Sequence, residues 1–246
     1  MCTVILLRRP GHAWPLILAA NRDERLDRAW DPPANHWPDR PGVVGGQDRS
    51  AGGTWMAMRG GVIAAVLNRP GSLGPAPGKR SRGELPLIAL ESDDAEGAAA
   101  RIADLDGGAW RPFNMVVADA RQAFFLRGLG EGAPRPVALG DGVSMVTAMD
   151  PNDMASPRTR RHLPRFRAAP PPDPGAADWA SWEALLSDRS FGEEGIAGAL
   201  NVPPTQGFGT VCASLVAFGG ANTRIWRFGA QPPSPGSFAT VTLEEP

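Results

Sequence analysis

The residues best suited to carry chemistry are Cys2 and the tetrapeptide Asn21-Arg22-Asp23-Glu24. Methionine aminopeptidases remove Met1 when a small residue follows, and this would leave Cys2 as the N-terminus. A terminal cysteine carries a thiol and an α-amine with ordinary pKa values of about 8.5 and about 8, so the amine can act as base for the thiol. We therefore predict a nucleophile at Cys2, and the alternative is a small buried residue that starts a strand.

The polar tetrapeptide follows a short apolar run, where it either forms an ordinary charged turn or lines a pocket. A hairpin of residues 4–7 and 16–20 would bring it to the same end as Cys2. In that arrangement the charge of Arg22 is predicted to stabilise the thiolate, and Asp23 to orient the α-amine. Asn68, which ends the apolar run 62–67, is predicted to donate its amide to an oxyanion.

The bulk composition limits the classes of function. The 246 residues are 42% hydrophobic, which suffices for a sizeable core. A net charge of −1 without a basic stripe argues against a nucleic-acid partner. No apolar run approaches a membrane span, and residues 4–7 are too short for a signal peptide, so we expect a cytoplasmic protein. The bias towards Arg, Ala, Gly and Pro, with one lysine, is typical of GC-rich bacterial genomes.

The apolar runs and turns predict mostly antiparallel pairing. Hairpins are expected over residues 4–20, 54–67, 113–126 and 210–228, with a further strand over 143–147 and a long connection over 27–52. One helix is expected to start at residues 81–84, because Ser81 and Glu84 have the spacing of a capping box. Further helices are expected over 94–105, 156–167, 178–186 and 193–200. Helices covering the outer faces of two sheets would give one α+β domain over 1–246, a four-layer αββα sandwich.

Metal and cofactor sites are not indicated. His12, His36 and His162 are scattered without a partner at the spacing of metal ligands, and each is expected on the surface or in a loop. We therefore expect no metal and no cofactor. The two cysteines, Cys2 and Cys212, fit a reducing compartment; a regulatory disulfide is conceivable if the last strand runs beside the first, but a small buried residue at 212 is the preferred interpretation.

Several motifs occur together in the order found in the NRDE family, which includes the transport-and-Golgi-organisation proteins of eukaryotes and many bacterial relatives. They are Cys2, Ala19-Ala20-Asn21-Arg22-Asp23-Glu24, Gly52-Gly53-Thr54-Trp55, Asn68, Ser81-Arg82-Gly83-Glu84-Leu85 and Phe113-Asn114. The resemblance covers the first half of the chain well and the second half loosely. The family resembles the N-terminal-nucleophile hydrolases, such as bile-salt and penicillin amidases, and this implies the αββα fold.

The resemblance implies roles where residues match. Cys2 corresponds to the nucleophile, Asp23 to the aspartate that positions it, and Asn68 to an oxyanion-hole asparagine. Asn21, Glu24, Trp55 and Arg82 are assigned to substrate binding on the same basis. Ala148 and Val211 depart from the pattern, because those amidases carry Asn and Arg there, and a lost oxyanion donor can cost several kcal/mol of transition-state stabilisation.

Two functions follow from these assignments. The first is an amidohydrolase that cleaves a C–N bond of a small molecule through an acyl-thioester on Cys2. The second is a non-catalytic protein that binds or traffics a hydrophobic ligand, with haem or an acyl-lipid implied by the resemblance. A degenerate fold with a purely structural role is the third alternative. Oligomeric state is not indicated by the sequence.

Overall fold

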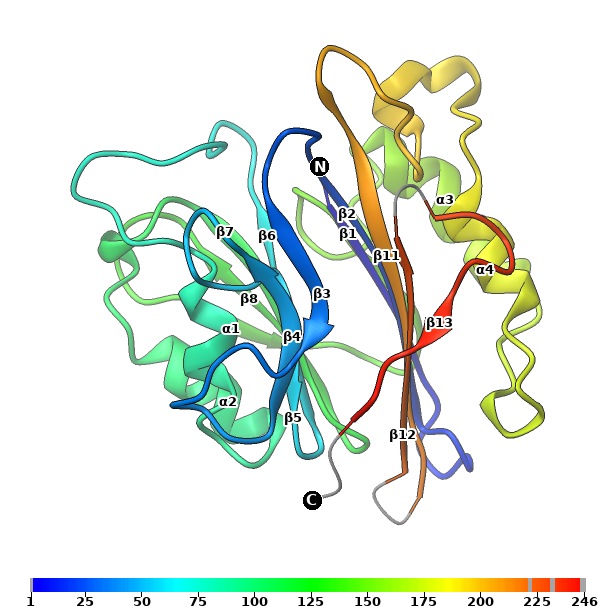
Figure 1. Ribbon diagram of the computed structural model, residues 1–246, viewed down its shortest axis with the longest axis horizontal. Helices are drawn as coiled ribbons and strands as arrows, with labels where there is room; N and C mark the ends of the chain where they lie inside the picture. The colour runs from blue at the N-terminus through cyan, green and yellow to red at the C-terminus, as the bar shows by residue number, and fades with distance from the viewer. Residues whose placement is uncertain (1, 221–222, 231–232, 244–246) are drawn as a thin grey trace. The chain divides into compact units, whose positions relative to one another are not determined.

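The computed structural model describes residues 2–220, 223–230 and 233–243, and its chain divides into two compact units (Figure 1). The first unit is Met1–Arg28 with Asp141–Val241, and the second is Ala29–Gly140 with Thr242–Pro246. Each unit contains an antiparallel sheet and two α-helices, which confirms the predicted α+β class with two largely antiparallel sheets. A single domain over 1–246 stays a prediction. Among the described helices, none has the length and apolar character required to cross a bilayer.

The first unit has a six-stranded sheet in the order β10-β1-β2-β11-β12-β13. Its strands are β1 (Thr3–Arg8), β2 (Leu16–Arg25), β10 (Gly142–Val146), β11 (Phe208–Phe218), β12 (Arg224–Ala230) and β13 (Ala239–Thr240). The predicted hairpin of β1 and β2 is confirmed, because Thr3 lies opposite Asn21 and Arg8 opposite Leu16. This register brings the start of β1 to the end of β2 that carries the polar tetrapeptide.

Helices α3 (Pro157–Ala168) and α4 (Ala180–Ser187) lie along one face of this sheet, as Figure 1 shows. Helix α3 begins where the sequence predicts, because the Ser156 hydroxyl accepts a hydrogen bond from the Thr159 amide and Pro157 occupies the first helical position. Its buried Phe166 meets Trp182 of α4 edge to face, at a centroid distance of 5.0 Å. Side chains of both helices therefore share one core with the sheet.

Two expectations for the first unit are wrong. The segment expected to be helical over 193–200 is a 3-10 stretch, Gly192–Gly198, interrupted at Gly195 with φ +61°. His162, expected at the surface, lies fully buried on α3, where its Nε2 is 2.8 Å from the Gly198 carbonyl oxygen. An apolar helix face can accept a histidine when a backbone carbonyl satisfies the ring nitrogen, and sequence spacing does not reveal such a partner. A further 3-10 helix of this unit is Pro174–Ala176.

The second unit has a seven-stranded sheet in sequential order from β3 to β9. Its strands are β3 (Trp30–Ala34), β4 (Val43–Asp48), β5 (Met56–Arg59), β6 (Val62–Asn68), β7 (Phe113–Ala118), β8 (Ala123–Gly128) and β9 (Arg135–Ala138). The hairpins β5–β6 and β7–β8 are confirmed. The long connection expected over 27–52 is wrong, because it contains β3 and β4. Their Pro and Gly residues hide the alternation of a strand, although an edge strand such as β3 tolerates proline.

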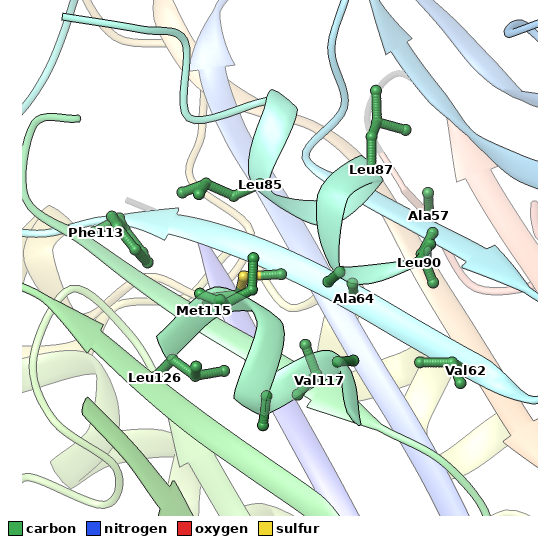
Figure 2. Close-up of a cluster of buried hydrophobic side chains, with 14 of the residues drawn as sticks. Ala57, Val62, Ala64, Leu85, Leu87, Leu90, Phe113, Met115, Val117 and Leu126 are labelled. Atoms are coloured by element: carbon green, nitrogen blue, oxygen red, sulfur yellow. The ribbon is translucent and has the colours of Figure 1, made fainter. Parts of the chain in front are cut away.

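Helices α1 (Glu84–Ala89) and α2 (Ala95–Ala103) cover one face of the second sheet, followed by a short 3-10 helix, Gly107–Ala109. Helix α2 lies within the predicted range 94–105, and Asp94 caps it by accepting a hydrogen bond from the Gly97 amide. The capping box is wrong, because the Ser81 hydroxyl accepts from the Gly83 amide and α1 begins only at Glu84. Figure 2 shows the apolar core beneath these helices, with side chains from α1 facing those of β6, β7 and β8. Each unit thus supplies one helical layer and one sheet layer.

In the motif Gly52-Gly53-Thr54-Trp55 of the second unit, close packing of the backbone leaves no space for a side chain at Gly53. A Cβ on Gly53 would lie 2.5 Å from the carbonyl carbon of Gly83, whose oxygen accepts the Thr54 amide at 2.9 Å. We expect Gly53→Ala to lower the free energy of unfolding by about 1–3 kcal/mol because the backbone must shift. Urea denaturation measures this, with Gly61→Ala as control, since a Cβ there meets nothing within 4 Å. Equal effects of the two substitutions would contradict the steric explanation.

Candidate functional site

The first unit gathers Cys2 and the tetrapeptide at one end of its sheet. Extending the β1–β2 register by one residue from Thr3 and Asn21 sets Cys2 opposite Arg22, and β11 sets Cys212 on the other side of Arg22. Alternate residues of a strand face opposite sides. Because Ile5 and Ala19 belong to the core under the helices, Cys2 and Arg22 face the side of the sheet away from α3 and α4.

Cys2 is half-buried, and its Sγ lies 3.6 Å from the backbone carbonyl oxygen of Asp23. Burial raises the pKa of the Cys2 thiol and the carboxylate of Asp23 raises it further, whereas Arg22 acts in the opposite direction. The thiol is therefore protonated near neutral pH, and attack on a substrate requires a base that accepts its proton. Met1 lies outside the described residues, so the removal of Met1 that would free the α-amine stays a prediction.

Arg22 is a buried cation on the same face as Cys2. Its Nη2 lies 3.5 Å from a carboxylate oxygen of Glu24, and that oxygen is also 3.7 Å from the Nε of Arg28. The Arg22 charge lowers the pKa of Cys2, which is the direction expected from the sequence. Since burial outweighs it, Arg22 alone does not make the thiol a thiolate.

Asp23 faces the opposite side of the sheet, towards the helices. Its side chain is 0% exposed, and its two oxygens accept hydrogen bonds from Arg158 Nη1 at 2.8 Å and Thr210 Oγ1 at 2.5 Å. Arg158 was not among the residues predicted from the sequence. The available signal was its place in the first turn of α3 after the predicted cap at Ser156-Pro157, but nothing in that spacing names Asp23 as its partner.

A β-bulge in β11 determines which residues reach the site. Thr210 pairs with Asp23 and Cys212 with Arg22, so Val211 is the extra residue between them. Without the bulge, alternation would put Thr210 and Cys212 on one face. With it, Thr210 joins Asp23 while Cys212 joins Arg22. Val211, which departs from the pattern expected from the resemblance, thus lies at the irregularity itself.

Asn21 anchors the end of β2 to the last turn of α4 and to Leu200, which follows α4 in the chain. Its Nδ2 donates to the carbonyl oxygens of Leu186 and Leu200, both at 3.0 Å, and its side chain is buried. Both amide protons are thereby used within the protein. Substrate binding by Asn21 stays a prediction.

The other predicted residues belong to the second unit. Asn68 is the last residue of β6, half-buried and opposite Phe113 of β7. Trp55 packs edge to face with Trp30 at a centroid distance of 5.7 Å. Arg82 donates to the Ser72 carbonyl and hydroxyl oxygens at 2.6 and 2.8 Å and so holds the loop that follows β6. The structure therefore groups Cys2 with Asn21, Arg22, Asp23 and Glu24 in the first unit, and Asn68, Trp55 and Arg82 occur in the second.

Cys212 does not form the disulfide considered from the sequence. Both cysteines are free, and β2 separates β11 from β1. Two strand spacings amount to about 9–10 Å, beyond the Cα separation of roughly 7 Å that a disulfide tolerates. Burial raises the pKa of Cys212 well above its usual range, so it is an inert buried residue. Ala148, the other position that departs from the pattern of the resemblance, is also buried.

Among the described residues, no three His, Cys, Asp or Glu side chains converge as metal ligands would.

Known proteins resemble the chain in sequence and in fold. Residues 1–146 match the profile of a family described as Transport and Golgi organisation 2. A mouse protein, Transport and Golgi organization 2 homolog, is 31% identical over 140 residues, which cover 53% of this chain and 49% of the mouse protein. The matched region therefore spans about half the length of that relative.

A solved structure shares the fold. It is the Caenorhabditis elegans ortholog of N-acylethanolamine-hydrolyzing acid amidase, with a TM-score of 0.54, 12% sequence identity, and coverage of 87% of this chain and 92% of the other. At this identity the likeness concerns the fold, that of an N-terminal-nucleophile hydrolase.

Proposed function

The chain belongs to the Transport and Golgi organisation 2 family on a hydrolase-like scaffold, and from this premise we propose that it is an amidohydrolase with Cys2 as nucleophile. The observation that carries the proposal is the position of Cys2, opposite the buried cation of Arg22 and with its Sγ at the backbone of Asp23. A half-buried thiol beside a cation at the edge of a polar cluster suits nucleophilic catalysis better than packing alone.

The proposed reaction begins after removal of Met1. The free α-amine of Cys2 takes the thiol proton, and the thiolate attacks the carbonyl carbon of an amide to form a tetrahedral oxyanion. The oxyanion collapses to an acyl-thioester while the resulting ammonium protonates the departing amine. Water, deprotonated by the same amine, then attacks the thioester, which releases the carboxylic acid and restores the thiol.

The amine group explains how a thiol with a raised pKa can react near neutral pH. Burial and the Asp23 charge keep the thiol of Cys2 protonated, so a resident base adjacent to the sulfur is required. The oxyanion that forms in this reaction requires an N–H donor, and the role of Asn68 as such a donor stays a prediction from the sequence. N-acylethanolamines are the first substrates to try, since the amidase of similar fold hydrolyses them according to its name.

Intact mass and hydrolysis test the proposal. We expect purified protein to lack Met1, to release the amine from N-acylethanolamines of one range of acyl lengths, and to lose this activity by more than about 1,000-fold in Cys2→Ala, because nucleophile removal leaves only residual catalysis. Cys212→Ala is the matched control and should retain activity, since that thiol is buried and inert.

Two outcomes would overturn the proposal. Hydrolysis that persists in Cys2→Ala would remove Cys2 from the chemistry. Retained Met1 together with a Soret band on titration with haem would favour the ligand-binding alternative instead.

A further inference from the structure

We propose that Arg158 is a positioning residue that holds both backbone segments flanking the Cys2 thiol. Its Nη1 donates to the Thr3 hydroxyl at 3.0 Å and to the Asp23 carboxylate at 2.8 Å. Thr3 directly follows Cys2 in the chain, and the Asp23 carbonyl oxygen lies 3.6 Å from the Sγ of Cys2. One guanidinium nitrogen therefore connects the residue after the nucleophile to the residue against which the nucleophile rests. The assignment to a reaction rests on the proposed function.

Burial makes this connection rigid. The side chain of Arg158 is 4% exposed and that of Asp23 is 0% exposed, and Thr3 is fully buried. Hydrogen bonds between ionised groups are shorter and stronger than neutral ones, and water does not compete for them here. A sulfur displaced by about 1 Å can lose about 100-fold in rate, so a clamp on both flanking segments is catalytically relevant although Arg158 faces the opposite side of the sheet.

Neighbouring elements also hold Arg158 and the Asp23 carboxylate in place. Arg158 is the second residue of α3, whose start is set by the Ser156 cap and Pro157. The other oxygen of the Asp23 carboxylate is occupied by Thr210, whose hydroxyl also accepts from the Val202 amide at 2.7 Å. The carboxylate thus has a fixed orientation, and Arg158 transmits that orientation to Thr3.

The chain offers a matched comparison on the same helix. Arg160 lies two residues further along α3 and pairs with Glu194 at 2.7 Å, but its side chain is 45% exposed. Arg160→Met removes the same kind of ion pair from the same helix without touching β1 or β2. Thr3→Val deletes one hydrogen bond of Arg158 and keeps its ion pair with Asp23.

The test uses the full chain with Cys212→Ala, so that Cys2 is the sole thiol. Alkylation of Cys2 by iodoacetamide is followed from pH 6 to 10, together with hydrolysis of N-acylethanolamines. We expect Arg158→Met and Thr3→Val to displace the pH profile of alkylation and to lower kcat by about 10- to 100-fold. Arg158→Lys restores a hydrogen-bond donor and a positive charge, so it should recover most of the parent's alkylation profile and most of its kcat. Arg160→Met should have the same alkylation profile and kcat as the parent.

The outcomes separate the two proposals. If the parent fails to hydrolyse amides but Thr3→Val and Arg158→Met still displace the alkylation profile, the proposed function fails and the role of Arg158 stands. If the parent hydrolyses amides and these variants behave like it, Arg158 is only structural and the inference is wrong. Should Arg158→Met not fold, Thr3→Val and Arg158→Lys decide the question in the same way.

Discussion

Arg158→Met is expected to lower the free energy of unfolding by about 3–5 kcal/mol, because it leaves the carboxylate of Asp23 buried without its cation. The side chain of Asp23 is 0% exposed and that of Arg158 only 4%, so solvent does not replace the lost partner. Urea denaturation at pH 7, followed by tryptophan fluorescence, measures the effect.

A double-mutant cycle tests whether the cost comes from the unpaired charge. In Asp23→Asn combined with Arg158→Met no charge remains buried, so the double variant should be more stable than the sum of the single effects predicts. Arg160→Met provides the comparison, since the exposed pair of Arg160 with Glu194 should contribute no more than about 1 kcal/mol. Simple additivity within the cycle would contradict the explanation.

Stability is expected to fall as the pH drops from 6.5 to 4, by about 3 kcal/mol from His162 alone. Burial lowers the pKa of His162 to about 4, and Arg165, Arg161 and Arg158 oppose its protonation, while the Gly198 carbonyl acts the other way. In the unfolded chain His162 binds a proton near pH 6.5, whereas in the folded protein it binds one only near pH 4. Between these values the unfolded state carries more protons, so stability rises with pH through the window and is fully present above it.

The measurement is urea denaturation at several pH values between 4 and 7. His162→Gln is the control, because its amide can donate to the Gly198 carbonyl oxygen in place of Nε2 and does not titrate. Its stability should vary less than that of the parent in this window. Identical pH dependence in both proteins would show that His162 is not the responsible group.

Local sequence signals predicted most elements of the fold. The β1–β2 hairpin, the β5–β6 and β7–β8 hairpins, and helices α2 and α3 all occur where apolar spacing and caps indicate them. The two strands that were not predicted, β3 and β4, share a physical cause. β3 and β4 are short and interrupted by Pro and Gly, and their conformation depends on pairing with neighbours rather than on their own residues.

The candidate site likewise contains residues that could be predicted from the sequence and residues that could not. Cys2 and the tetrapeptide were recognisable because they are close in sequence and joined by one hairpin, whose register follows from its turn and its apolar pattern. Arg158 and Thr210 were not recognisable, since they lie 135 and 187 residues from Asp23 in the chain. No local pattern encodes a contact at that separation.

The sequence by itself determined the nucleophile candidate, the strand that carries it and the class of fold, because these depend on residue type and short-range periodicity. Tertiary structure alone decided that Asp23 faces Arg158 and Thr210 while Arg22 faces Cys2. That division follows from strand alternation in β2 and from a single extra residue, Val211, in β11. A bulge shifts every side chain beyond it to the other face, and its presence depends on the pairing of strands that are distant in the chain.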